Sequence, residues 1–363
     1  MVNYFAPAFR VEVNGARLQA DVSMNIEHVE IVSKPDTIDT FSFTITNAMP
    51  KMRWTHTDDD ELFTEAKSVK IAMGYVDDLR DMIEGEITQI HPDFPADAIP
   101  TLTVEGHSLL HRLQGNNKTR TFQNVTDKQI VEQLAQDAGL EADAEDPNVQ
   151  YEYVIQANQT DLDFLRDRAR RIHFEVLVQN RKLIFRRSQE NQTKTYTLLW
   201  AETQKSVAAS GRVLPLKSCS LQMNTLKPPT TVEVRSYDPK SKQAFVSRAG
   251  SADQTSRMGG RQTGADVSTT FQRQRGHVHV STPFASQQEC DQHARAAYNN
   301  EAMGLITGNA ATIGTPDLHS GQVIELRGIG KRFEGEYLVD EATHSLGGDG
   351  YQTSLNLKRN AVS

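Results

Sequence analysis

The 363-residue sequence has few cysteines and lacks the segments that direct a chain into or across a membrane. Its two cysteines, Cys219 and Cys290, exclude a disulfide framework and fit folding in a reducing cytoplasm. No stretch approaches the roughly 18 apolar residues of a membrane span. The N-terminus, MVNYFAPAFRVEVNG, lacks the basic and apolar parts of a secretory signal. If this protein leaves the cell, we expect it to leave inside a larger particle or by lysis.

Long basic runs are also missing, and the formal net charge is −8. The basic clusters at 166–171 and 185–187 are local and lie near acidic residues. Specific binding of nucleic acid is therefore not expected, because such binding depends on concentrated positive charge. The composition, 37% hydrophobic and 24% charged, is that of a soluble globular protein long enough for two to four modules.

The common catalytic and cofactor-binding motifs are absent. We find no G-x-S-x-G, H-E-x-x-H, C-x-x-C or G-x-x-x-x-G-K-[ST], and no G-x-G-x-x-G after a strand. Gly328-Ile329-Gly330 lies between two expected strands and is interpreted as a hairpin turn. The sequence therefore predicts no catalytic residue, no cofactor-binding residue and no enzyme activity.

Four histidines are candidates for metal ligands or catalytic groups. His277 and His279 would share one face of a strand and form a possible metal edge, but no third ligand is placed by the sequence. His91 and His344 occupy matching positions in two similar segments, which favours a structural role over catalysis. No metal site is predicted.

Two acidic clusters were also considered. Asp161 and Asp163 could suggest the paired carboxylates of a glycosidase, but residues two apart on a helix point in different directions. A role in the first turn of a helix is the better account. The acidic run 58–61 lacks the alternating oxygen ligands and the glycine bend of a calcium loop, so we interpret it as solvated loop.

An internal repeat organises the chain. Residues 69–106 and 323–358 both contain alternating strands, a short polar turn, an E-G-E centred on Gly85 or Gly335, and a closing strand. Period-2 alternation broken by turn residues indicates antiparallel β structure. Two copies at opposite ends of one chain predict a duplicated small β-barrel, although chance similarity between hairpins remains an alternative.

The expected fold class is mainly β with an α+β insert. The predicted parts are a first barrel at 1–114, an α+β insert at 115–190, strands of a second barrel at 191–235, a loop-rich insert ending in a helix at 236–303, and the second barrel at 304–363. In the first part, Asn14-Gly15 predicts a hairpin, and the alternation resumes at Leu18, Ala20 and Val22.

Helix signals mark the inserts. Thr126 and Gln129 fit a capping box, and Thr160 starts a second helix. Ser286 and Glu289 fit another capping box. Residues 236–276 are rich in Ser, Gln, Gly and Arg with few apolar anchors, which predicts a mobile loop or a surface ordered by a partner.

Several segments resemble the baseplate hub proteins of contractile phage tails and injection systems, namely the late control protein D family and the hub half of the valine-glycine-repeat proteins. The block QANQTDLDFLRDRA at 156–169 resembles the family signature Q-x-N-x-T-D-x-x-F-L-x-x-R-A. Shorter segments that also resemble the family are 122–127, 85–90, 232–239, 314–316, 321–323, 335–337, and His344 with Gly350-Tyr351. Residues 240–285 are not matched.

The resemblance implies a structural hub that adapts a six-fold tail tube to a three-fold spike. A trimer of a chain with two similar barrels would present six similar barrels in a ring. The implied partners are two further copies of the chain, a tail tube ring, a separate trimeric spike and other baseplate components. The spike is expected on another polypeptide because the valine-glycine-repeat proteins continue beyond this region. The resemblance also implies synthesis in the bacterial cytoplasm and incorporation into a phage tail, tailocin or injection-system particle.

Two other function classes remain open at this stage. A tail-associated cell-wall hydrolase would release peptidoglycan fragments with turnover. A carbohydrate-binding β module would need exposed aromatics on one sheet face, whereas the two tryptophans, Trp54 and Trp200, lie far apart in sequence. The hub hypothesis predicts a trimer in solution, or a monomer that trimerises with its spike.

Overall fold

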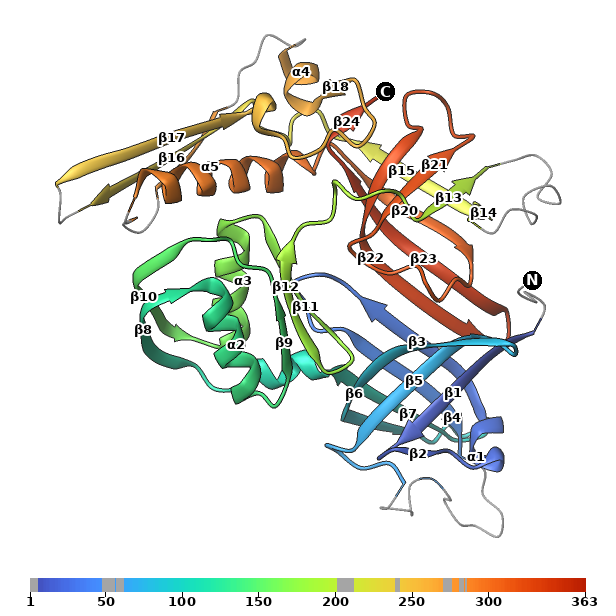
Figure 1. The fold of residues 1–363 in the computed structure, drawn as a ribbon. Coiled ribbons are helices and arrows are strands. Elements are labelled where there is room, and N and C mark those ends of the chain that lie inside the picture. The colour runs from blue at the N-terminus through green and yellow to red at the C-terminus, as the bar shows by residue number, and fades with distance from the viewer. Residues whose placement is uncertain are drawn as a thin grey trace.

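The computed structural model describes residues 6–47, 56, 62–200, 212–238, 242–269, 276–280, 284 and 286–363. One large hydrogen-bonded sheet of 14 strands dominates it, and smaller sheets and helices attach to that sheet (Figure 1). The acidic run 58–61 and Trp54 lie outside the described residues. In the described part of the chain, no helix combines the length and apolar character needed to cross a membrane.

The large sheet consists of two sections of seven strands. The N-terminal section has the order β2-β1-β5-β6-β7-β4-β3. Its strands are Pro7–Val13 (β1), Ala16–Arg17 (β2), Ile26–Ser33 (β3), Thr40–Thr46 (β4), Ser68–Tyr75 (β5), Asp78–Asp93 (β6) and Thr101–Ser108 (β7).

The C-terminal section has the order β14-β13-β21-β22-β23-β20-β15. Its strands are Tyr196–Leu199 (β13), Val213–Pro215 (β14), Ser218–Met223 (β15), Ile306–Ile313 (β20), Val323–Arg327 (β21), Gly335–Gly347 (β22) and Gly350–Arg359 (β23). The two orders correspond strand for strand. The sections differ at one end, where β13 pairs in parallel with β21 and β14, whereas β1 is antiparallel to β5 and β2.

Each section has its own apolar core, built from the inward positions of its alternating strands. In β4, for example, Phe41, Phe43 and Ile45 are buried while the residues between them are partly exposed. The period-2 alternation read from the sequence is therefore the alternation between core and solvent. Leu18, Ala20 and Val22 were predicted to continue a strand. This prediction is wrong, because Ala20–Met24 forms the short helix α1.

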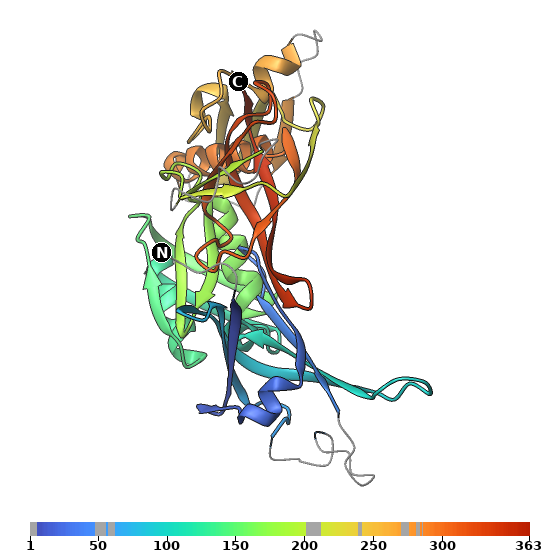
Figure 2. The ribbon, with the colours of Figure 1, turned by 90° about the vertical axis from the view of Figure 1, so that its right-hand side faces the viewer.

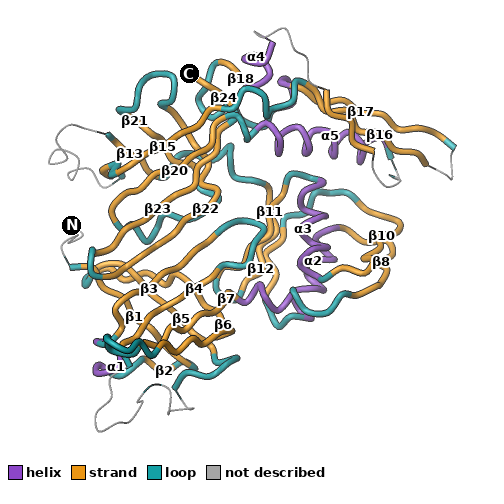
Figure 3. Tube along the Cα trace, turned by 180° about the vertical axis from the view of Figure 1, so that it is seen from behind, coloured by secondary structure: helices purple, strands orange, loops and turns teal. Residues whose placement is uncertain are grey.

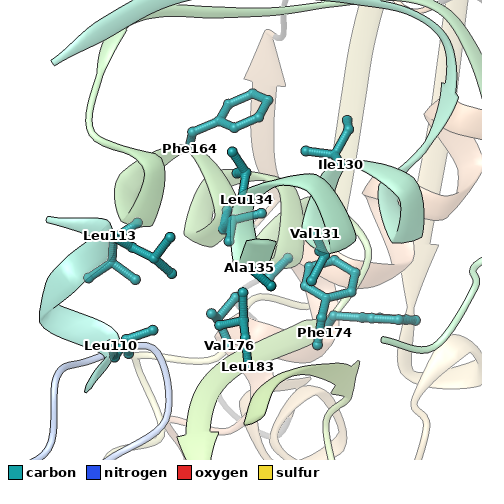
Figure 4. Packing of buried hydrophobic residues seen from close by; sticks show 14 of the residues in the cluster. Leu110, Leu113, Ile130, Val131, Leu134, Ala135, Phe164, Phe174, Val176 and Leu183 are labelled. Atoms are coloured by element: carbon teal, nitrogen blue, oxygen red, sulfur yellow. The ribbon is translucent and has the colours of Figure 1, made fainter. Parts of the chain in front are cut away.

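The insert between the sections is an α+β body with its own apolar core, to which its helices contribute (Figure 4). Its elements are the 3₁₀ helix Leu109–Leu113, the strands Lys118–Thr126 (β8), Glu141–Ala144 (β9), Gln150–Gln159 (β10), Phe174–Gln179 (β11) and Lys182–Arg187 (β12), and the helices Asp127–Asp137 (α2) and Asp161–Arg171 (α3). Its apolar residues come from both helices and from the strands around them. The predicted capping box at Thr126 and Gln129 is confirmed, with both reciprocal hydrogen bonds present.

A third body, which we call the arm, extends beyond the insert (Figures 1 and 3). The strands Thr231–Asp238 (β16), Gln243–Gly250 (β17) and Gly276–Val280 (β19) form its sheet, and the helix Gln287–Ala302 (α5) packs on that sheet. The helix Gly264–Thr269 (α4) and the two-stranded sheet of Gln262–Thr263 (β18) and Ala361–Val362 (β24) lie near the C-terminus.

Residues 236–276 were predicted to be a mobile loop or a surface ordered by a partner, but the strand β17 and the helix α4 lie within this segment. Residues 243–250 pair with β16 over its full length, and Met258 is buried against Met303, Val323 and Leu338. The sparse apolar residues of this segment are sufficient because they fill gaps against elements distant in sequence, which the local composition does not reveal.

Candidate interaction site

The two sheet sections are joined edge to edge by one pair of strands. β22 lies antiparallel to β3, with Leu346 opposite Val29, His344 opposite Ile31 and Ala342 opposite Ser33. Figure 1 shows the C-terminal strands (red) running down onto β3 (blue) at this joint. Residues more than 300 positions apart in the sequence thus pair in one continuous ladder. We therefore consider the strand edges that form this joint, and their counterparts in each section, as the candidate interaction site.

Apolar side chains seal the joint. Leu346 and Tyr351, both from the C-terminal section, are buried in the core of the N-terminal section. The Tyr351 ring lies 5.8 Å from the ring of Tyr75. The hydroxyl of Tyr75 donates a 2.7 Å hydrogen bond to the carbonyl oxygen of Gly314. The tip of the β22–β23 hairpin is therefore part of its neighbour's core.

His344 is fully buried beside the joint. Its Nδ1 lies 2.9 Å from the hydroxyl of Tyr351, and its Nε2 lies 3.0 Å from the carbonyl oxygen of Leu318. A carbonyl oxygen only accepts hydrogen bonds, so Nε2 carries the proton and Nδ1 is the acceptor, with the Thr353 hydroxyl at 3.2 Å as a second neighbour. Burial, reinforced by the neighbouring His319, lowers the pKa of His344 to about 3. This histidine is neutral and structural at ordinary pH.

Ion pairs flank the same strand on its outer face. Lys34 Nζ lies 3.7 Å from carboxylate oxygens of both Asp340 and Glu341, and Lys358 Nζ lies 2.8 Å from Asp340. Although burial opposes ionisation, the Lys358 ammonium lowers the pKa of Asp340. These partly exposed pairs connect β3, β22 and β23, and each is worth at most about 1 kcal/mol in such a setting.

Backbone hydrogen bonds define how the two sections correspond. The amide of Ile87 donates to the carbonyl of Lys67, and the amide of Ala66 donates to the carbonyl of Ile87. In the C-terminal section, the amide of Val339 donates to Gln322 and the amide of Gly321 donates to Val339. Ala66 and Gly321 both have a positive φ, 65° and 80°. A register irregularity follows directly in both strands, between residues 87 and 89 and between residues 339 and 341.

This correspondence corrects the alignment of the repeat. Ile87 matches Val339, so Gly85, which lies opposite Val69, matches Tyr337, which lies opposite Ile324. The two E-G-E segments are therefore displaced by two residues although they lie on matching hairpins. A residue pattern with period 2 is unchanged by a shift of two, which is why the sequence could not detect it.

The predicted match between His91 and His344 is wrong for the same reason. Counting from the shared irregularity, His91 corresponds to Thr343, and Pro92 corresponds to His344. His91 is exposed, whereas His344 is 1% exposed. The two histidines therefore face opposite sides of their strands.

Each section has a second edge that is not used within the chain. Among the described residues, β15 pairs only with β20, and the side of β6 beyond Ile87 that faces away from β7 pairs with no strand. β15 corresponds to β3, and β6 corresponds to β22. These two open edges, unlike the outer edges of β2 and β14 at the ends of the sheet, are the counterparts of the two strands that form the joint.

The other residues weighed from the sequence are dispersed. His277 and His279 lie on β19, and both contact the carboxylate of Glu301, with 2.9 Å between His279 Nε2 and Glu301 Oε1. Among the residues that the structure describes, no group of three or more His, Cys, Asp or Glu side chains is arranged to hold a metal ion. Gly328 and Gly330 lie in the turn between β21 and β22, and both have a positive φ.

Asp161 and Asp163 have different roles. Thr160 caps α3 and accepts from the amide of Asp163. Asp161 is buried and binds Lys118 and Arg120 at 2.6 Å each, with Gln156 at 2.9 Å. Although burial opposes ionisation, Lys118, Gln156 and Arg120 lower the pKa of Asp161. This network ties α3 to the β8–β10 sheet, a role that the sequence prediction missed.

A second buried ion pair in the insert was also missed. Arg168 Nε lies 2.6 Å from Asp127 Oδ1, and both side chains are almost fully buried. The hydroxyl of Tyr151 donates to Asp127 at 3.1 Å, and the Arg168 guanidinium lies over the Tyr151 ring. The only sequence signal was a basic residue on the apolar side of a helix.

The sequence matches the family model described as the Alg8 N-terminal domain over residues 6–347. The chain belongs to this family. No curated protein matches the sequence.

Solved structures share the fold of this family member. The 43 kDa tail protein of prophage MuSo2 from Shewanella oneidensis has a TM-score of 0.71 at 11% identity, covering 99% of this chain and 100% of that one. The tail protein from Neisseria meningitidis MC58 has a TM-score of 0.69 at 13% identity, covering 98% and 97%. The E. coli c3393 protein, a component of the type VI secretion system, has a TM-score of 0.58 at 13% identity, covering 97% and 77%. At such low identity, the likeness establishes a shared fold.

Proposed function

We propose that this protein is a structural baseplate hub, which adapts a six-fold tail tube to a three-fold spike in a contractile tail or injection system. The observation that carries the proposal is the duplication within the chain, since two sheet sections with the same strand order are joined edge to edge. Three copies supply six similar sections. A trimer can then be nearly six-fold where these sections form a ring and three-fold where the inserts and arms differ.

The fold likeness to phage tail proteins and to a secretion-system component supports the same role. The partners of such a hub are two further copies of the chain, a tube ring, a separate trimeric spike and other baseplate components. The proposal includes membership of the late control protein D family and assembly from the bacterial cytoplasm into a particle. The first barrel is at 1–114, and the second is formed by 191–235 and 304–363. The insert at 115–190 lies between the two barrels, and the segment at 236–303 interrupts the second.

The role is geometric, so no bond is made or broken by this chain. Strand edges and loops bind neighbours, while the buried ion pairs of the insert keep that body rigid. A hydrolase would instead require a nucleophile and an oriented base exposed in a cleft. Incubation of the purified protein with peptidoglycan is expected to release no fragments, and measurable turnover would favour the enzyme.

The test of the hub is the mass of the purified full-length chain, measured by sedimentation over a range of concentrations. We expect three times the chain mass of 40.6 kDa, and electron micrographs with three-fold symmetry and six similar lobes. A chain that stays monomeric at every concentration even in the presence of its spike protein, or that forms rings of another order, contradicts the proposal.

A further inference from the structure

The joint inside one chain indicates how two chains meet. We infer that the edge of β15 of one copy pairs antiparallel with the free edge of β6 of the next copy, repeating between subunits the pairing that β3 and β22 make within one subunit. This inference rests on the proposed trimer and names the surface that closes it. The partner is a second copy of this chain.

The register of the proposed pair follows from the internal one. Phe43 of β4 corresponds to Ala310 of β20, because they lie opposite Val104 and Leu355, which occupy matching positions of β7 and β23. Val29 lies opposite Phe43 and Cys219 lies opposite Ala310, so Val29 and Ile31 of β3 correspond to Cys219 and Leu221 of β15. On the other side, the shared irregularity makes His344 correspond to Pro92.

The internal pairs therefore translate into pairs between copies. His344 opposite Ile31 becomes Pro92 opposite Leu221. Thr343 opposite Val32 becomes His91 opposite Gln222. Because proline has no amide hydrogen, Pro92 can contribute only its carbonyl to the ladder, and the remaining positions must supply the other hydrogen bonds.

The amino-acid composition of β15 indicates that its open edge is covered by another strand in the assembly. Its sequence, SCSLQM, has no charged residue and no proline, and its apolar positions Cys219, Leu221 and Met223 are only partly buried. Soluble proteins usually protect an exposed edge strand with charges, proline or a bulge, because an unprotected edge recruits another strand. An edge without such protection is expected to have a partner.

The β6–β7 hairpin supports the same conclusion from the other side. Figure 2 shows this hairpin (teal-green) projecting away from the rest of the molecule. Its counterpart, the β22–β23 hairpin, inserts Leu346 and Tyr351 into the core of the neighbouring section. At the corresponding tip, Phe94 is 50% and Ile99 is 64% exposed. A projecting hairpin with an apolar tip fits insertion into the next copy.

Disulfide trapping tests the pairing in the full-length chain. We would introduce His91→Cys and Gln222→Cys together, after replacing the native Cys219 by Ser; the remaining Cys290 is fully buried. Both substituted positions are exposed, so neither disturbs a core. Directly opposite residues of an antiparallel pair have Cβ atoms about 5 Å apart, close enough for a disulfide.

Two matched variants calibrate the result. Thr343→Cys with Val32→Cys occupies the equivalent positions of the internal joint and should form a bond within one chain. His91→Cys with Ser218→Cys displaces one partner by four residues along the strand, about 13 Å, and should not react.

The inferred pairing predicts covalent trimers on non-reducing gels for His91→Cys with Gln222→Cys, at least tenfold more than for the displaced pair. A protein that sediments as a trimer but forms no such bond, although the internal pair does, overturns this pairing and leaves the hub intact. Equal trapping by the displaced pair also overturns it. A protein that sediments as a monomer both alone and with its spike protein overturns the pairing and the hub together.

Discussion

Two histidines that look equivalent in the sequence differ in what surrounds them. His344 is enclosed between Tyr351 and Leu318 at the joint, whereas His91 is exposed on the projecting hairpin. Burial disfavours the imidazolium of His344 and lowers its pKa, so this residue should influence stability as the pH changes.

The first prediction concerns acid stability. Between pH 6.5 and about 3 the unfolded chain binds a proton at His344 and the folded chain does not, so the free energy of unfolding decreases as the pH falls through that range. This one group contributes a slope of up to about 1.4 kcal/mol per pH unit. His344→Gln should therefore flatten the pH dependence of urea unfolding.

His91→Gln is the matched control for this measurement, because the same substitution there replaces an exposed side chain and removes no buried imidazole. Equal slopes for wild-type protein and His344→Gln would show that the buried imidazole is protonated in the folded state. That result would contradict the lowered pKa of His344 whether or not the substitution also causes a general loss of stability.

At the level of elements, positions that hold a large side chain in one sheet section hold a small residue in the other, and the reverse. In the N-terminal section, the Phe41 ring of β4 lies over Gly85 of β6 and Gly106 of β7. A Cβ atom on Gly106 would lie 2.2 Å from the Phe41 ring and 2.4 Å from the carbonyl oxygen of Glu86. These glycines are required because the large ring occupies their side of the sheet.

In the C-terminal section the order is reversed. Gly308 of β20 corresponds to Phe41, while Tyr337 of β22 and Leu357 of β23 correspond to the two glycines. Both cores are filled, but the large and the small residues come from different strands in the two sections. Such exchange conceals a duplication from residue-by-residue comparison while the strand order remains visible.

The second prediction uses this close approach. Gly106→Ala should destabilise the protein by roughly 2–4 kcal/mol, because the Cβ atom meets both a packed ring and a backbone carbonyl. The measurement is the free energy of unfolding in urea.

Gly115→Ala provides the comparison, since a Cβ atom there meets nothing within 4 Å. Its effect should lie within about 0.5 kcal/mol of zero. Equal effects of the two substitutions would refute the proposed packing of Phe41 against Gly106.

At the scale of the whole molecule, the residues that stabilise the fold of one subunit differ from the residues that contact the next subunit in the proposed trimer. The apolar tip of the β6–β7 hairpin contributes little to the core of its own subunit, since Ile99 is 64% exposed. In the proposed trimer the same residue lies beside the next copy. A change there should alter association while the fold of each subunit is retained.

The third prediction follows from this separation. Ile99→Asp should keep the unfolding midpoint of the monomer and weaken trimer formation at least tenfold, as measured by sedimentation. Val76→Asp is the control, because Val76 is 65% exposed at the opposite hairpin, in the turn between β5 and β6. Loss of the trimer in both variants, or in neither, would contradict the assigned surface.

Local signals predicted much of the fold correctly. The alternation of Phe41, Phe43 and Ile45, the Asn14-Gly15 turn and the capping residue Thr126 all lie where the sequence indicated. These features depend on neighbours within a few residues, so their physics is present in the local sequence. The helix at Ala20 was missed because three alternating residues are too few to distinguish the two periods.

The register of the repeat and the joint could not be read in this way. The E-G-E motifs suggested one alignment, and the backbone hydrogen bonds of Ile87 and Val339 define another, two residues away. The pairing of β22 with β3 joins segments at opposite ends of the chain. Such pairing depends on which edges meet after folding, and no local pattern encodes that choice.

The sequence by itself determined that the chain is built mainly from alternating strands, with capped helices between two similar β regions, because hydrophobic period and capping chemistry act over a few residues. The tertiary structure decided how the copies correspond, which histidine is buried, and which edges are joined and which stay open. Those outcomes depend on burial and on ladder hydrogen bonds between distant segments, which exist only once the chain has folded.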